Sequence, residues 1–238
     1  MPDESAIKER LATELHGLGF DLVGWASAAR YNSLVESKYH LPLLNQADPV
    51  VAVVGNTRGL WQRFLDAVKN APELVDHEHP LDTWVESQLD PVGEGATVLA
   101  HMAYAHTMGH GAIAIQTLGV LAGMGFTAPC QLSIHRRHGP WFSFRAAIVL
   151  DLPHTAQQRG PVDTCTGCLE KPCMKVSQHV DVAAQDATFD GVRAQWENWL
   201  AIRQACPIGK GFQFSRSQSA YHYTHDRRWL LESLNGSS

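Results

Sequence analysis

Apolar residues recur at helical spacing in several stretches of the chain. Near the start, Ile7, Leu11 and Leu15 are four residues apart, which predicts an amphipathic helix over residues 5–16. Similar spacing predicts further helices over residues 60–68, 81–89 and 191–203, with a break at 91–95 and a last helix before residue 234. Each of these helices is expected to cover a hydrophobic core with one face.

Continuous or alternating apolar runs predict strands between these helices. Residues 50–54 are four valines and an alanine, which is typical of a strand buried on both faces, and a shorter strand is expected at 21–25. Residues 130–135 and 141–150 also have strand character. Because the basic turn RRHGP at 136–140 joins them, we expect these two segments to form a β-hairpin.

The hydrophobic periodicity that predicts helices and strands is weakest over residues 96–125. A helix rich in glycine and alanine is expected over residues 113–122, where small side chains let a flat ligand or, more commonly, another backbone approach closely. His101, His106 and His110 precede it, and the last two would share one face of a helix at metal-ligand spacing. Glycines on both sides of His110 disfavour a helix there, so a metal site is the minor interpretation.

Composition and charge narrow the class of protein. The chain has 238 residues, of which 45% are hydrophobic and 18% charged, so it is long and apolar enough to form a folded core. The net charge of -5 disfavours a nucleic-acid partner. The charged start lacks the apolar core of a signal peptide, and no apolar run reaches the roughly 18 residues of a membrane helix. We therefore expect a soluble cytoplasmic protein without a membrane partner.

Four of the five cysteines form the most specific chemical pattern. Cys165, Cys168 and Cys173 lie close together, and Cys206 follows after 32 intervening residues, directly before a proline. Clustered thiols of this kind hold iron–sulfur centres, and ferredoxin-type sequences complete such a run with a distant Cys-Pro pair. Ser177 stands where a ferredoxin-type run would place its next cysteine, so the pattern predicts one [4Fe-4S] cluster rather than two.

Two other interpretations of these cysteines stay open. Four thiolates also suit structural zinc, although zinc ribbons usually contain two C-x2-C pairs and this chain has one. Alternatively, the thiols are free remnants of a decayed motif. The fifth cysteine, Cys130, stands apart on an expected strand and is interpreted as a core residue.

Two further turns could bind an anion. Gly55 and Asn56 follow the buried strand and precede a helix, so backbone N–H groups there could hold a phosphate such as that of FMN. The more common explanation is a tight turn in which Thr57 caps the helix. The basic turn at 136–140 could grip a carboxylate, an amide or a phosphate, or it could simply be solvated.

Several stretches together resemble the MMACHC (CblC) family of vitamin B12-processing proteins. They are YNSL at 31–34, HLPL at 40–43, VVAVVGNT at 50–57, IHRRHGPWFSFRAAIVL at 134–150 and SRSQSAYHYTHDRRWLL at 215–231. The cysteine segment instead resembles that of bacterial ferredoxin-like relatives on the same scaffold. In outline it is similar to epoxyqueuosine reductase and reductive dehalogenases, which combine a B12-binding domain with ferredoxin-type clusters.

The resemblance implies an α+β fold with a nitroreductase- or flavin-reductase-like antiparallel sheet, flanking helices and a small cysteine-rich ferredoxin-like segment. The implied domains are a corrinoid-binding core at 1–155, an iron–sulfur segment at 156–212 and a C-terminal helix at 213–238 that packs on the core. Corrinoid would lie over the sheet face, near the expected hairpin at 135–145.

The resemblance also assigns residues to this corrinoid site. Arg137 matches the arginine beside the ligand in the family motif. The other candidates for cofactor binding are neighbours of that motif or belong to the glycine-rich helix and the turn after the buried strand: His135, Gly139, Trp141, Gln116, Gly55 and Asn56.

The function that follows is a cobalamin-binding, iron–sulfur-dependent reductase or B12-processing protein, which would remove the upper ligand of cobalamin reductively. Its cofactors would be one [4Fe-4S] cluster and cobalamin, with FMN as an open alternative. Two other functions are considered: a non-catalytic electron carrier or corrinoid chaperone, and an FMN-dependent nitroreductase-like enzyme. The redox partner stays open, as does a homodimer.

Overall fold

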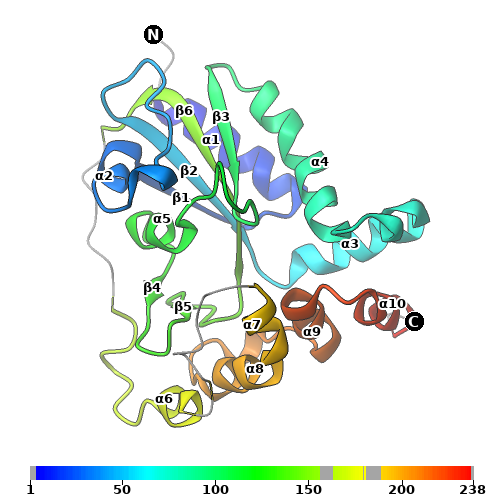
Figure 1. Cartoon of the computed structure of the whole chain (residues 1–238). Coiled ribbons are helices and arrows are strands. Elements are labelled where there is room, and N and C mark those ends of the chain that lie inside the picture. Colours follow the sequence, from blue (N-terminus) through cyan, green and yellow to red (C-terminus); the bar gives the residue numbers. More distant parts are fainter. Residues whose placement is uncertain (1–3, 156–162, 179, 181–188, 237–238) are drawn as a thin grey trace.

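The computed structural model describes residues 4–155, 163–178, 180 and 189–236 (Figure 1). Its centre is a four-stranded antiparallel sheet with the strand order β1-β2-β6-β3. The strands are β1 (Leu22–Ser27), β2 (Pro49–Asn56), β3 (Ala100–Tyr104) and β6 (Ser143–Pro153). The mixture of helices with an antiparallel sheet agrees with the predicted α+β class.

Helices cover both faces of this sheet (Figure 1). On one face lie α1 (Glu4–Leu18), α3 (Gly59–Asn70) and α4 (Pro80–Glu94). On the other face lie the shorter helices α2 (Ala28–Asn32) and α5 (Ile115–Leu121). The predicted helices at 5–16, 60–68 and 113–122 are therefore confirmed, with boundaries that differ by a few residues.

The apolar run of β2 is explained by this three-layer arrangement. Val50, Ala52 and Val54 pack into the core beneath α1, α3 and α4, whereas Val51 and Val53 pack toward α2 and α5. Because successive side chains of a strand point to opposite faces, a strand covered on both sides is apolar at every position. All eight residues of β2 are buried.

The predicted hairpin across the basic turn is wrong. The strand β6 pairs with β2 and β3, while β5 (Ser133–Ile134) pairs with β4 (Phe126–Thr127) in a separate two-stranded sheet. A single bridge between His135 and Gly139 is the only pairing across the turn among the described residues. The long apolar strand β6 needs a partner on each edge, and the central sheet supplies both.

The expected break at 91–95 is also wrong, because α4 continues through Pro91 to Glu94. Leu89 and Val92 are both buried, so the last turn is held on the core despite the proline. The Gly95 N–H still donates to the Pro91 carbonyl at 2.8 Å.

The C-terminal third is mainly helical and lies below the sheet in Figure 1. It contains α6 (Pro172–Ser177), α7 (Phe189–Ala194), α8 (Trp196–Ala205), α9 (Arg216–Thr224) and α10 (Arg227–Asn235). The helix predicted at 191–203 is thus two helices, α7 and α8. None of the helices in the described residues has the length and apolar character that a membrane span requires.

In the described part of the chain, three short 3-10 helices lie between these elements. They are η1 (Ser37–Tyr39), η2 (Pro72–Asp76) and η3 (Lys210–Phe212). A separate small core joins the cysteine segment to the β4–β5 region, through Leu132, Ile202 and their neighbours. Residues 128–134 therefore pack with the cysteine segment rather than with the central sheet, and the predicted domain boundaries stay a prediction.

Candidate functional site

The four cysteines predicted to bind a metal come together in the structure. Cys165, Cys168, Cys173 and Cys206 line one small cavity with apolar walls. A turn brings the first two together, since the Cys168 N–H donates to the Cys165 carbonyl at 3.0 Å. Cys206 comes from the C-terminal end of α8, where it is the capping residue. The local turn and helix α8 thus bring the four thiols together in one site, which is called the four-thiol site.

The long gap between the second and third cysteines is closed by a local backbone feature. Lys171 has a left-handed backbone with φ of 41°, and Pro172 then begins α6. Pro is favoured at the first position of a helix because its missing N–H has no partner there anyway. Cys173 consequently lies in the first turn of α6 and faces the other thiols.

The surroundings of these thiols disfavour thiolates without a bound cation. Burial raises the pKa of Cys165 and Cys206, and the neighbouring thiols raise both further. Burial together with Cys130 and Cys168 raises the pKa of Cys173 to about 11. A bound metal supplies the positive charge that holds such thiols deprotonated. Four such thiols in one cavity could hold a metal or cluster, and this assignment stays a prediction.

Cys130 is a fifth member of this group that the sequence did not reveal. It is buried, as predicted, but it lies in the turn before β5 rather than on a strand. Its thiol is hydrogen bonded to that of Cys173. Cys130 is far from the other cysteines in the sequence, and its spacing to them follows no metal-binding pattern, so only the fold places it here.

The basic turn at 136–140 packs against the chain that follows Cys206. A Cβ on Gly139 would lie 2.0 Å from the Ile208 carbonyl oxygen, and a Cβ on Gly209 would lie 2.1 Å from the His138 carbonyl oxygen. Both glycines have positive φ, which other residues adopt at a cost. The turn and the cysteine segment therefore meet backbone against backbone.

The predicted ligand residues of this turn are engaged in internal contacts. The Nδ1 atom of His135 accepts the backbone N–H groups of Arg137 and His138, at 3.2 and 3.1 Å. Burial and the charges of His138, Arg136 and Arg137 lower the pKa of His135 to about 4, so its ring is neutral at pH 7. Trp141 is buried against Phe214.

The Arg137 side chain is exposed, and its guanidinium lies over the Phe212 ring, 5.5 Å from the ring centroid. Gln116 is exposed on α5, on the other side of the sheet from α3 and α4. Their proposed contact with corrinoid stays a prediction.

The turn after β2 already contains an internal anion. The Asp21 carboxylate accepts the Thr57 N–H at 2.7 Å and the Thr57 hydroxyl at 2.5 Å. The predicted capping role of Thr57 is wrong, since the residue at the start of α3 is Arg58 and it makes no side-chain cap. Asp21 thus stands at the helix N-terminus where a phosphate would otherwise fit. Gly55, two residues before Thr57, belongs to buried β2.

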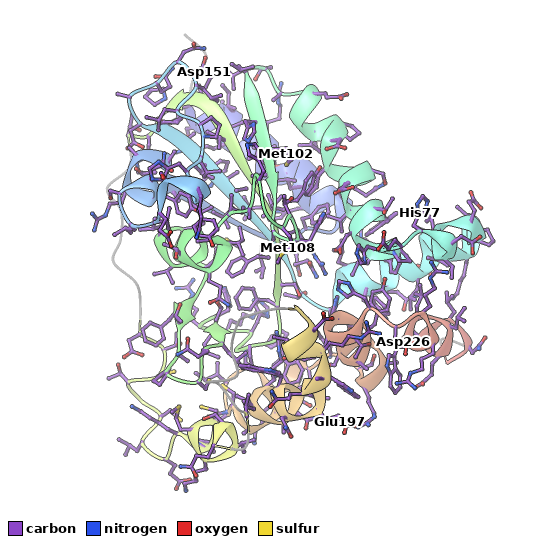
Figure 2. The ribbon with its side chains drawn as sticks, in the orientation of Figure 1. His77, Met102, Met108, Asp151, Glu197 and Asp226 are labelled. Carbon is purple, nitrogen blue, oxygen red and sulfur yellow. The ribbon has the colours of Figure 1, made fainter. Side chains whose placement is uncertain are left out.

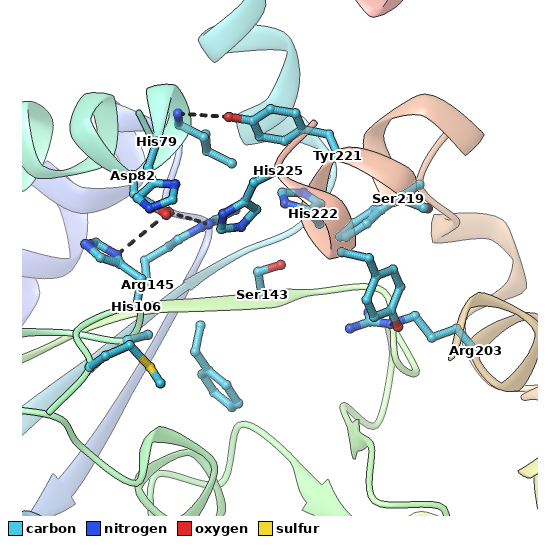
Figure 3. Close-up of a pocket in the computed structure, with 16 residues that line it drawn as sticks. His79, Asp82, His106, Ser143, Arg145, Arg203, Ser219, Tyr221, His222 and His225 are labelled. Carbon is cyan, nitrogen blue, oxygen red and sulfur yellow. Dashed lines mark hydrogen bonds and ion pairs between the residues drawn. The ribbon is translucent and has the colours of Figure 1, made fainter. Parts of the chain in front are cut away.

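A large cavity of about 500 Å³, which the sequence did not identify, lies beside these elements (Figure 3). It lies between β6, the start of α4 and α9. Phe144, Phe214 and Met108 give it apolar walls, and Arg145 and Arg203 give it cationic ones. Met108 is on the loop between β3 and α5 (Figure 2). Such a mixture of apolar walls with a few polar groups is typical of a small-molecule site.

Arg145 is the most strongly held polar residue of the cavity. It is 8% exposed, and its Nε donates to the Asn56 Oδ1 at 2.6 Å. Burial lowers its pKa, and Asp82, whose Oδ1 is 4.0 Å from the guanidinium, opposes that shift. Burial and the charges of Arg145 and Arg203 hold the pKa of His222 well below its usual value. Asn56, predicted as a cofactor ligand, thus positions Arg145.

The cavity and the four-thiol site share the end of α8. Arg203 lines the cavity, donates through its Nε to the Tyr223 hydroxyl at 2.6 Å and also donates to the Pro140 carbonyl. Cys206 follows three residues later. On α9, which also carries Tyr223, the buried Ser219 hydroxyl has no hydrogen-bond partner among the described residues.

The three histidines weighed as a metal site do not gather. His101 is on β3 and His110 is exposed in a turn, so the helix needed for the pairing of His106 with His110 is absent from the described residues. Only His106 lines the cavity, where its Nε2 is 2.8 Å from Glu86 and its Nδ1 is 3.7 Å from Asp82.

Comparison with known proteins finds similar folds but no similar sequences. No family model and no curated protein matches the sequence. Among solved structures, the fold is that of a B12-trafficking protein, CblC from C. elegans, described as a homologue of human MMACHC. The two sequences are 16% identical, and the match covers 97% of this chain and 94% of the CblC chain. The TM-score is 0.68.

Epoxyqueuosine reductase from Streptococcus thermophilus is a second similar structure. The two sequences are 13% identical, and the match covers 88% of this chain and 68% of the reductase chain, with a TM-score of 0.54. Epoxyqueuosine reductase has also been solved with a tRNA stem loop, and that structure matches with a TM-score of 0.50. At these identities the likeness establishes the fold and agrees with the resemblance drawn from the sequence.

Proposed function

We propose that the protein binds a corrinoid and a single iron–sulfur cluster, and that it processes cobalamin reductively. The observation that carries this proposal is the junction at the end of α8, where Cys206 belongs to the four-thiol site and Arg203 to the large cavity. Three helical residues advance about 4.5 Å along the axis. The two sites are therefore immediate neighbours, as an electron donor and its acceptor must be.

The four-thiol site fits a [4Fe-4S] cluster. Four cysteine thiolates are the usual ligand set, and hydrogen bonds to the sulfur atoms adjust the reduction potential. The buried Thr164 hydroxyl beside Cys165 has no hydrogen-bond partner among the described residues, so it is available to a sulfur atom of the cluster. When bound, the cluster would supply single electrons to the corrinoid cobalt.

The large cavity fits part of a corrinoid, which has a flat apolar ring and amide side chains. Phe144 offers an apolar surface, and it is held by α5, because a Cβ on Gly119 would lie 2.2 Å from its ring. The Arg203 guanidinium lines the cavity and is available for amide oxygens. The fold of CblC, described as a B12-trafficking protein, supports this choice of ligand.

The FMN alternative receives no support from the turn after β2. A phosphate at the N-terminus of α3 would have to displace the Asp21 carboxylate from Thr57, with which it makes two hydrogen bonds. Two anions cannot share one helix terminus without strong repulsion.

The first experiment tests the metal centre. Protein purified without oxygen is analysed for iron, acid-labile sulfide and zinc, and its visible spectrum is recorded. We expect about four irons and four sulfides per chain, with a broad absorption shoulder. Zinc in place of iron would overturn the redox function and leave only a structural role for the cysteines.

The second experiment tests the position of the corrinoid by titration with cob(II)alamin, followed by its absorption spectrum. The variant Ser143→Trp fills the large cavity, whereas the matched variant Gln116→Trp adds the same bulk on the exposed face of α5. We expect the spectral change to be lost only in Ser143→Trp. Loss only in Gln116→Trp would move the ligand to the α5 face, and no spectral change in the wild type would end the proposal.

Turnover then separates a reductase from a carrier. With excess chemical reductant and an alkyl- or cyanocobalamin substrate, a reductase releases many equivalents of product for each chain. A corrinoid chaperone or electron carrier binds one equivalent and stops. Product limited to one equivalent would assign the carrier function instead.

A further inference from the structure

A second group of metal-binding residues lies in the wall of the large cavity. The ligand atoms of His79, Asp82 and His225 are all within 4.8 Å of one another (Figure 3). His79 directly precedes α4, Asp82 is in its first turn, and His225 directly follows α9. The imidazoles of His79 and His225 meet edge to face with centroids 5.2 Å apart. None of these residues belongs to the four-thiol site.

Two imidazoles and one carboxylate form a donor set that suits divalent transition metals. Zinc and non-haem iron sites use this combination, with further coordination positions open to water or substrate. A metal about 2.1 Å from each ligand requires the three atoms to come closer than about 4.2 Å. The group must therefore contract slightly, which the exposed side chain of His79 can do by rotation.

We propose that His79, Asp82 and His225 bind one divalent transition-metal cation, such as Zn²⁺ or Fe²⁺, whose open positions face the cavity. All three residues line that cavity. The site is separate from the cluster and does not require the corrinoid proposed above. It would give the cavity a Lewis acid beside whatever ligand the aromatic walls hold.

The residues around Asp82 have the character of an outer coordination shell. The Nδ1 of His106 is 3.7 Å from Asp82 Oδ1, and the Nε2 of His106 is 2.8 Å from Glu86. Such chains of carboxylate and imidazole hold a ligand in position in many metal sites. Arg145, 4.0 Å from the same Oδ1, opposes a cation electrostatically. This charge disfavours Ca²⁺ and Mg²⁺, which depend on carboxylates, and favours metals that bind imidazole strongly.

The third ligand, His225, is positioned by its backbone conformation and is partly buried. His225 has a left-handed backbone with φ of 50°, which ends α9 and turns the chain toward α10. Burial lowers the pKa of His225, which favours the neutral imidazole that binds metals.

The test uses Co²⁺ as a spectroscopic probe, because thiolate ligands give an intense sulfur-to-cobalt charge-transfer band and imidazole or carboxylate ligands do not. Full-length, corrinoid-free protein with its cysteine site loaded is titrated without oxygen, and bound cobalt is counted by equilibrium dialysis. We expect one equivalent of cobalt without the charge-transfer band. His79→Ala and Asp82→Asn should each weaken this binding at least tenfold.

His77→Ala is the matched control, because His77 is exposed two residues before His79 and lies outside the group (Figure 2). It should bind cobalt as the wild type does. Cobalt bound only with the charge-transfer band, or equal affinity in all variants, would overturn the proposal. Circular dichroism checks the fold, and the exposed His79 gives a decisive variant even where Asp82→Asn is unstable. The cob(II)alamin titration is a separate readout, so the two proposals fail independently.

Discussion

At the scale of single residues, Cys206 joins the two candidate sites. It is buried, it caps α8, and it lines the small cavity with three cysteines from a distant part of the chain. The proline that follows it ends the helix, so the thiol is presented at a fixed point. Loss of this one residue should remove a quarter of the ligand set and free the end of α8.

We predict that Cys206→Ala removes the iron–sulfur cluster as completely as Cys168→Ala does. The cluster is held by four thiolates, so a variant with three leaves one iron without a protein ligand and should not retain the cluster. Iron and sulfide content after anaerobic purification measures this loss. Ser177→Ala is the control, because the Ser177 hydroxyl donates to the Met174 carbonyl, at 2.9 Å, and Ser177 carries no thiol. Four irons in Cys206→Ala would refute the four-ligand assignment.

Cys130 should tune the cluster without binding it. Its thiol is hydrogen bonded to Cys173, and a hydrogen bond to a ligand sulfur stabilises the more negative, reduced cluster. Cys130→Ala is therefore expected to keep four irons and to lower the reduction potential, as measured by a redox titration. If iron is lost instead, Cys130 is itself a ligand and one of the predicted four is not.

His135 should make the protein less stable in mild acid. Its folded pKa is about 4, below the ordinary value near 6.5, so the unfolded chain binds more protons than the folded one between these pH values. This contribution to stability is present above pH 6.5 and is lost as the pH falls toward 4.

The variant His135→Asn tests this contribution, since Asn keeps an acceptor for the Arg137 and His138 N–H groups but does not titrate. We expect its melting temperature to fall less than that of the wild type between pH 7 and pH 5. His77→Asn, at an exposed position, should behave like the wild type. An unchanged acid sensitivity in His135→Asn would show that other groups dominate.

At the scale of elements, the basic turn and the chain after Cys206 act as one contact. Gly139 and Gly209 let the two backbones approach more closely than any side chain would allow. Through this contact the strand β6, which carries Phe144 and Arg145 into the large cavity, is tied to the cysteine segment. The turn at 136–140, which was predicted to bind a ligand, therefore also connects the four-thiol site to the large cavity.

We predict that Gly139→Ala destabilises the protein by about 2–5 kcal/mol. The left-handed backbone costs roughly 1–2 kcal/mol for a residue with a Cβ, and forcing apart packed backbones costs about 1–3 kcal/mol more. Chemical unfolding followed by circular dichroism measures this difference. Gly167→Ala is the matched control, because nothing lies within 4 Å of a Cβ there. Equal stability of the two variants would contradict the close contact.

At the scale of the whole molecule, the fold is shared with proteins that have different partners. Epoxyqueuosine reductase has been solved with a tRNA stem loop, whereas CblC is described as a B12-trafficking protein. The present chain has a net charge of -5. Binding to a polyanion depends on Lys and Arg side chains that neutralise phosphates. A chain with a net negative charge therefore repels the phosphates of a tRNA.

We therefore expect no retardation of tRNA by this protein in an electrophoretic mobility assay at physiological salt. A basic nucleic-acid-binding protein of similar size provides the positive control. Retardation that weakens steeply with added salt would show a phosphate-binding surface and would shift the proposed function toward tRNA modification.

The sequence by itself determined those features that depend on neighbours along the chain. The spacing of Ile7, Leu11 and Leu15 was enough for α1, and the valines of β2 were enough for a strand buried on both faces. The cysteine set was found because thiolates that bind one metal follow local spacing rules, and Cys206 because of its proline. In each case the physical constraint acts within a few residues.

Only the tertiary structure decided which distant residues meet. The partners of β6, the contact of Cys130 with Cys173 and the meeting of His79 with His225 depend on the path of the chain around the sheet. Periodicity records which face of an element is buried, but it does not record what covers that face. For this reason the four-thiol site was visible in the sequence, and the cavity beside it was not.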